Sequence, residues 1–62
     1  MSEAQNTTKV PAQFVRTGDF VIKDGHPVEV LSKYSGGVEV ILTMADGSED
    51  GYGSRQRVEV VA

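Results

Sequence analysis

The sequence of 62 residues contains no cysteine, no tryptophan and a single histidine. Without cysteine the chain can form neither disulfides nor thiolate metal sites. With His26 as the only imidazole, it also lacks most of the nucleophile–base pairs on which covalent catalysis depends. An apolar pocket that could raise the pKa of a carboxyl group needs more core than this length provides. We therefore expect no enzyme active site, no cofactor and no small-molecule substrate.

Long apolar runs are also missing. The first ten residues, MSEAQNTTKV, have neither the basic start nor the apolar stretch of a signal peptide. No apolar stretch approaches the length that a bilayer span requires. We therefore expect a cytoplasmic protein without membrane contact, of the kind typical of small bacterial or phage accessory proteins.

Positive charge is scarce, because six Lys and Arg residues face nine Asp and Glu residues, for a net charge of −3. Affinity for a phosphate backbone depends on clustered Lys and Arg, so this balance argues against strong nucleic-acid binding. Weak binding through a local basic patch stays open as an alternative. Its candidate residues are four cations of the folded part and the two tyrosines: Arg16, Lys33, Tyr34, Tyr52, Arg55 and Arg57.

What the sequence does contain is a series of short runs rich in Val and Ile, separated by Gly and Asp. No window places apolar residues at helical spacing, so the runs predict strands. Asp24-Gly25 predicts a two-residue hairpin turn in which both residues have positive φ. Further turns are expected at residues 35–37 and 45–48, with a single 3₁₀ turn at 54–56. The five predicted strands span about 19–23, 27–34, 38–44, 49–53 and 58–61.

The chain begins with a polar stretch that has no periodicity. Residues 1–11 end at Pro11 and predict a flexible, disordered tail. Residues 12–62 then form one domain, since the length leaves no room for a second.

Three Val-Glu-Val triplets predict which side chains face the core. Successive strand residues point to opposite faces, so each triplet places two valines inside and one glutamate in water. Extending this alternation predicts a core of nine residues: Phe20, Ile22, Val28, Val30, Val38, Val40, Leu42, Val58 and Val60. Four aliphatic residues then fall outside, at Val21, Leu31, Ile41 and Val61.

This outward apolar set is the feature that points to function, since adjoining exposed aliphatic residues mark a contact surface. We interpret it as the binding surface for a protein partner or a second copy. The other interpretation is that strand coiling, or a bulge after Val30, turns some of these residues inward, or that the tail covers them.

Asp46, Ser48, Asp50 and Gly51 have the spacing with which an EF-hand calcium loop begins. The twelfth position should be a bidentate glutamate, but it is Arg57, and no helices flank the segment. Asp-Gly pairs are also standard turn formers. We therefore interpret the segment as a hairpin turn and expect no metal site.

Five short strands with tight turns predict an all-β, partly open barrel, because closing the sheet hides its edges. Thr17-Gly18-Asp19-Phe20-Val21, followed by the segment from Asp24 to Val30, resembles the opening of KOW-type domains and of the elongation factor P N-terminal domain. The resemblance covers residues 14–32 and implies an SH3-like barrel. Elongation factor P carries a functional lysine at a loop tip, whereas the matching residues 35–37 contain none, so its translational role is not implied.

The sequence thus predicts a non-catalytic interaction module that binds a protein partner, or itself, through an apolar sheet face or an exposed strand edge. The alternatives are a weak nucleic-acid-binding barrel and a structural subunit of a larger assembly.

Overall fold

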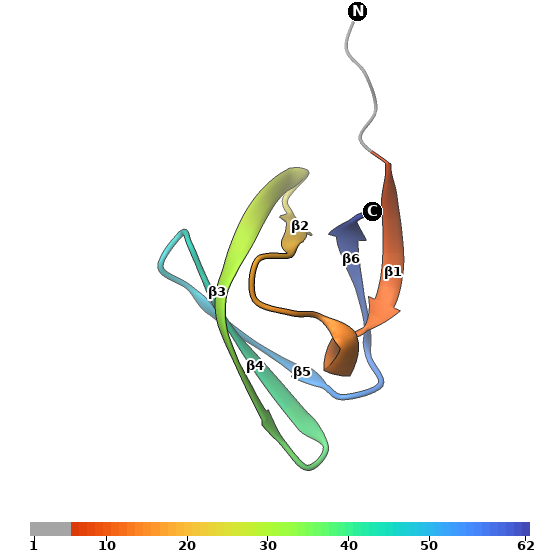
Figure 1. The fold of residues 1–62 in the computed structure, drawn as a ribbon, viewed down its shortest axis with the longest axis vertical. Helices are drawn as coiled ribbons and strands as arrows, with labels where there is room; N and C mark the ends of the chain where they lie inside the picture. The colour runs from red at the N-terminus through yellow and green to blue at the C-terminus, as the bar shows by residue number, and fades with distance from the viewer. Residues whose placement is uncertain (1–5) are drawn as a thin grey trace, which may run out of the picture.

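The computed structural model describes residues 6–62, which form a single antiparallel sheet and one short 3₁₀ helix (Figure 1). The elements of this part are β1 (Thr7–Pro11), η1 (Ala12–Phe14), β2 (Phe20–Lys23), β3 (His26–Gly36), β4 (Glu39–Met44), β5 (Glu49–Gly53) and β6 (Arg57–Val61). The strand order is β1-β6-β2-β3-β4-β5, so β1 and β5 are the outer strands of an open sheet. The all-β prediction is confirmed. Within residues 6–62, no helix has the length and apolar character needed to cross a membrane.

The described residues contain six strands, not the five predicted, because β1 forms within the segment expected to be a tail. Thr7 to Pro11 pair antiparallel with β6, from Thr7 opposite Val61 to Pro11 opposite Arg57. The prediction of disorder is wrong for residues 7–11, and for residues 1–5 it lies outside the described residues. Strand pairing uses backbone groups, so β6 can recruit a polar partner strand that has no apolar alternation of its own.

The chain between β1 and β2 closes one end of the sheet. Ala12 N donates to Gln56 O over 2.8 Å, and Gln13 N donates to Ser54 O over 3.1 Å. Ala12 and Val15 are fully buried. The β5–β6 turn that they contact is itself closed by a 3.0 Å hydrogen bond from Gln56 N to Gly53 O.

The hairpin turns fix the register of the strands. Asp24 and Gly25 have φ values of 52° and 80°, so the predicted turn with two positive φ values is confirmed. The β3–β4 turn comprises Gly37 and Val38, slightly later than predicted, and Gly37 has the positive φ of 63° that the first position of a type II′ turn requires.

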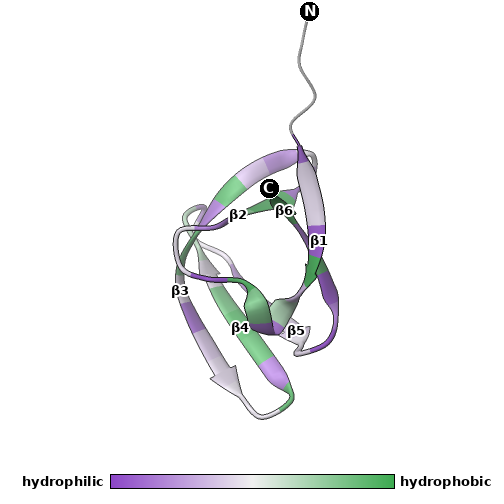
Figure 2. Cartoon of the chain, turned by 45° about the vertical axis from the view of Figure 1, so that its right-hand side comes forward, coloured by the Kyte–Doolittle hydropathy of each residue, from purple (hydrophilic) through white to green (hydrophobic). Residues whose placement is uncertain are grey.

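The core corresponds only partly to the predicted set. Five of the nine predicted residues are buried (Val30, Val40, Leu42, Val58 and Val60), together with Val21, Met44, Ala12 and Val15. Figure 2 shows apolar stretches on β4 and β6, the strands that carry four of those five residues. Ile22 and Val28 are half-buried. Val38 is 81% exposed because it lies in the β3–β4 turn instead of a strand.

The prediction that Val21 faces outward and Phe20 inward is wrong. Val21 is 1% exposed and Phe20 is 43% exposed. The two-residue turn sets Phe20 opposite Glu29 and Val21 opposite Val28. Residues that oppose each other in an antiparallel pair share a face, so Phe20 shares the solvated face of Glu29.

A bulge in β3 supplies the register shift that the sequence left open after Val30. Val30 pairs with Met44 and Ser32 pairs with Thr43, so Leu31 is the extra residue. Beyond the bulge, Lys33 stands opposite the buried Leu42, and Tyr34 stands opposite Ile41. The bulge thus turns Lys33 to the inner face of the sheet and Tyr34 to the outer face.

Candidate functional site

Three of the four predicted contact residues face outward: Leu31 on β3, Val61 on β6, and Ile41 on β4, where it alternates with the buried Val40 and Leu42. Leu31 is 53% exposed, and Val61 is half-buried. Val21 pairs with Val60, and continuing this antiparallel register by one residue sets Phe20 opposite Val61. Leu31 follows Glu29, the partner of Phe20, by two positions on β3 and is the unpaired residue of the bulge. We name the apolar residues of this face the outer patch: Phe20, Ile22, Leu31 and Val61.

Two of the four predicted contact residues, Val21 and Ile41, do not join the outer patch. Val21 lies in the core beneath it. Ile41 is half-buried and stands between Tyr34 on β3 and Gly51 on β5. The Tyr34 ring extends along β3 over Gly36, where an added Cβ would lie 2.7 Å from the phenolic oxygen. Tyr34 therefore shields the backbone of its own strand while most of its surface stays in water.

Carboxylates stand beside the outer patch. Glu29 is opposite Phe20, and Glu59 is opposite Lys9 in the β1–β6 ladder. Thr7 Oγ1 donates to Glu59 Oε2 over 2.6 Å, which ties β1 to β6 by side chains as well as backbone. The outer patch thus combines exposed apolar surface with an acidic margin.

The residues that resemble a calcium loop do come together, but around a cation of the chain itself. Lys23 Nζ lies 2.9 Å from Asp50 Oδ2 and 3.5 Å from Asp46 Oδ2, and it donates to Ser48 Oγ over 2.6 Å. Asp46 Oδ1 accepts hydrogen bonds from the Ser48 backbone N (2.9 Å) and from Ser48 Oγ (2.6 Å). Lys23 therefore occupies the position between the oxygens, and we name these four residues the lysine cluster.

These contacts shift three pKa values. The contact with the Asp50 carboxylate is the main cause that raises the pKa of Lys23 above its ordinary value. The hydrogen bonds from Ser48, chiefly from its hydroxyl, lower the pKa of Asp46. Burial, followed by the charge of Asp50, raises the pKa of Tyr52, whose ring packs against the core. Both shifts within the lysine cluster favour the ionised forms of Lys23 and Asp46.

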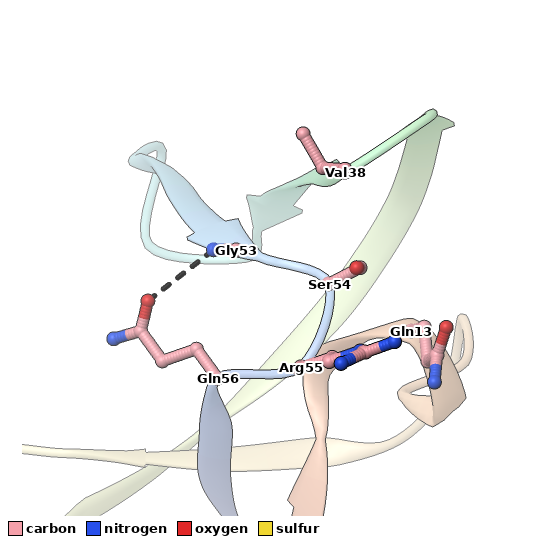
Figure 3. Close-up of a pocket in the computed structure, with 6 residues that line it drawn as sticks. All are labelled: Gln13, Val38, Gly53, Ser54, Arg55 and Gln56. Atoms are coloured by element: carbon pink, nitrogen blue, oxygen red, sulfur yellow. Dashed lines mark hydrogen bonds between the residues drawn. The ribbon is translucent and has the colours of Figure 1, made fainter.

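A groove lies at the opposite end of the sheet, between η1, the β3–β4 turn and the β5–β6 turn (Figure 3). Its volume is about 590 Å³, and it is lined by Gln13, Val38, Gly53, Ser54, Arg55 and Gln56. Ser54 N donates to Val38 O over 2.7 Å, and Gly53 N donates to Gln56 Oε1 over 3.3 Å. One backbone–backbone and one backbone–side-chain hydrogen bond therefore hold its walls. We name it the η1 groove.

Four of the six predicted nucleic-acid residues gather around η1, and the two tyrosines do not join them. Lys33 Nζ donates to Gln13 O over 2.6 Å, and the Arg55 side chain lies beside Gln13 in Figure 3. Arg57 stands opposite Pro11, just before η1, and Arg16 follows η1 by two residues. Tyr34 is on the outer face, and Tyr52 packs against the core. No two-tyrosine platform accompanies the basic residues.

Two contributors to these surfaces were missing from the sequence-based sets. Phe20 was assigned to the core, although the Asp24-Gly25 turn alone implies that it pairs with Glu29. Gln13 carries no chemical signal in the sequence, and only the hydrogen bond of its backbone N to the β5–β6 turn reveals its place. Turn-determined register was therefore the signal that could have identified the outer patch.

Across residues 6–62, no group of three or more His, Asp and Glu side chains is arranged to hold a metal ion. No protein-family model matches the chain, and no curated protein matches its sequence.

Proposed function

We propose that this chain is a non-catalytic interaction module that binds a protein partner, or a second copy of itself, through the outer patch. The observation that supports this function is the exposure of two large apolar side chains, Phe20 and Leu31, on the paired strands β2 and β3. Apolar neighbours of this size in water mark a contact surface. Because strands hold the backbone beneath them, binding orders little of the chain and costs little conformational entropy.

The fold that we propose for the module is the SH3-like barrel of the KOW type. The supporting feature is the strand order: β2 to β5 follow one another along the sheet, and β6 returns beside β2. A strip that curls back in this way forms a partly open barrel. Its free outer strand β5 contains neither Lys nor Pro, the residues that commonly block edge pairing, so this edge offers a second contact route.

Replacing Leu31 with Lys tests the outer patch. We expect Leu31→Lys, and equally Phe20→Lys, to abolish association, because a charge in the centre of an apolar contact must be desolvated. Val38→Lys is the matched control, since it makes the same kind of change at an exposed apolar residue in the β3–β4 turn.

Sedimentation velocity of each purified variant measures self-association, and affinity capture from host lysate with mass spectrometry measures partner binding. Circular dichroism confirms that each variant is folded. The proposal requires Leu31→Lys to lose a contact that Val38→Lys keeps. Equal behaviour of the two variants, or unfolding of Leu31→Lys, would contradict it.

A further inference from the structure

The η1 groove has a lining that favours a negatively charged ligand. Its six lining residues include no carboxylate, and they present the Arg55 guanidinium, the Gln13 amide and the Ser54 hydroxyl. All three groups donate hydrogen bonds. The Gln56 amide is engaged within the turn, because its Oε1 accepts from Gly53 N. Only Val38 adds apolar surface to the lining.

The positive charge around the groove is not neutralised by nearby acids. Within residues 6–62, the ion pairs involve Lys23 alone, at the other end of the sheet. Asp19 Oδ2 accepts a hydrogen bond from the Arg16 backbone N over 2.9 Å. Glu39, which begins β4, turns its carboxylate toward Gly51 on the outer face. Arg55 in the groove wall, and Lys33 beside the lining residue Gln13, therefore form no ion pair with an acidic side chain of the described residues.

We propose that the η1 groove binds a phosphate group, carried by a small phosphorylated molecule such as a nucleoside polyphosphate or by a nucleic-acid strand. The planar fork of Arg55 matches phosphate oxygens in a bidentate manner. Lys33, fixed at Gln13 O, supplies a second charge, which suits a group that carries up to two negative charges. The groove, with a volume of about 590 Å³, leaves room for a phosphate group.

Phosphate suits this arrangement better than a carboxylate. A carboxylate carries one charge and can be held by the Arg55 guanidinium alone, which would leave Lys33, bound at the lining residue Gln13, without a role. A phosphate linked to a larger group can also place that group against Val38 and the exposed Phe14, which follows Gln13 on η1. This site goes beyond the protein contact at the outer patch and is independent of it. It also goes beyond the sequence-based expectation, which was that the chain has no small-molecule substrate.

Titration of the ¹⁵N-labelled full chain with sodium pyrophosphate, followed by NMR, tests the proposal. We expect saturable shifts at the Ser54 and Arg55 amides and at the Arg55 Nε–Hε signal, with a Kd of about 1 mM or lower in low-salt buffer. Arg55→Gln should weaken binding roughly tenfold, the equivalent of about 1.4 kcal/mol. Lys9→Gln is the matched control, because it removes a cation from β1, opposite Glu59.

The same affinity in Lys9→Gln as in the unaltered chain supports a defined site. An equal loss in Lys9→Gln and Arg55→Gln would overturn the proposal, because the binding would then be diffuse attraction. Absence of saturable shifts would also overturn it. So would tighter binding of poly-glutamate than of pyrophosphate, which would assign the groove to an acidic polypeptide.

Two further probes identify the source of the phosphate. Tighter binding of ATP than of pyrophosphate supports a nucleoside polyphosphate whose base contacts Phe14 or Val38. Displacement of pyrophosphate by oligothymidylate without a terminal phosphate supports backbone phosphates of a single strand. Both results must depend on Arg55, and a result unchanged in Arg55→Gln would contradict the site.

Discussion

At the scale of single residues, Val21 joins two parts of the sheet. It pairs with Val28 on β3 and with Val60 on β6, and its side chain is buried. Its neighbour Phe20 is larger but partly exposed. Size and hydrophobicity therefore do not decide which residue stabilises the fold, because register decides which side chain leaves water.

Of these two neighbouring residues, the smaller should contribute more to the free energy of unfolding. We expect Val21→Ala to lower the free energy of unfolding by about 2 kcal/mol, from lost burial and the cavity left behind. Phe20→Thr, which places a β-branched residue of good strand propensity at a partly exposed site, should cost less than half of that. Urea denaturation followed by circular dichroism measures both. A larger loss of unfolding free energy for Phe20→Thr than for Val21→Ala would mean that Phe20, and not Val21, faces the core.

The sequence contained the information for Phe20 but not for Leu31. Phe20, Val21 and Ile22 are all apolar, so alternation gives no signal in β2, and only the register set by the Asp24-Gly25 turn assigns its faces. Leu31 is an ordinary residue in an ordinary strand, without the glycine that would mark a bulge. Leu31 and Val61 were nevertheless predicted to face outward, and both do so at least in part.

At the scale of elements, β1 shows how a strand can form without a sequence pattern. Most of its residues are exposed, and only Val10 packs against the core. Its pairing partner β6 carries Val58, Val60 and Val61. Because β1 covers β6, β1 becomes the outer strand on this side of the sheet. It contains Lys9 and Pro11, residues that discourage further pairing. The β2–β3 turn, by contrast, was predictable because a local dipeptide determines it.

Removal of residues 1–11 should destabilise the chain and promote aggregation. We expect a lower urea midpoint, because the pairing with β6 and the contacts of Val10 are lost. The exposed edge of β6, rich in valine, would then be free to pair with other chains. Urea denaturation and light scattering at increasing protein concentration measure the two effects. An unchanged midpoint together with unchanged scattering would show that β1 contributes nothing to the fold.

At the scale of the whole molecule, the two ends of the open sheet are closed by different chemistry. The lysine cluster closes one end by ionised side chains from β2, the β4–β5 turn and β5. Backbone hydrogen bonds from η1 to the β5–β6 turn close the other. The sequence identified most of the charged residues involved, yet it could not show that Lys23 meets Asp46 and Asp50, or that Arg55 and Lys33 both flank Gln13. These contacts join residues that are far apart in the sequence, so they depend on how the strands pair in the folded chain.

Acid should weaken the lysine cluster before it affects the other end. The pKa of Asp46 is lowered, so folding favours its ionised form. The stabilisation is complete above its ordinary pKa of 3.8 and is lost as the pH falls through the lower folded value. Ser48→Ala removes the chief cause of this shift and should raise the pH at which stability is lost. Urea midpoints measured from about pH 2 to pH 6 test this.

Asp46→Asn provides the control for the acid transition. It removes the titrating group, so the decline in urea midpoint below the ordinary pKa of Asp46 should become shallower. An acid decline that is identical in Asp46→Asn and the unaltered chain would place the pH dependence outside the lysine cluster.

The bulge at Leu31 changes which residues of β3 face inward. Up to Val30 the even-numbered residues of β3 face inward, and from Lys33 onward the odd-numbered residues do. Deletion of Leu31 would remove the extra residue and leave a regular ladder, in which Lys33 still stands opposite Leu42 and Tyr34 opposite Ile41. The faces of Lys33 and Tyr34 are therefore set by pairing with β4 from the β3–β4 turn, and the bulge absorbs the one residue that β3 has in excess.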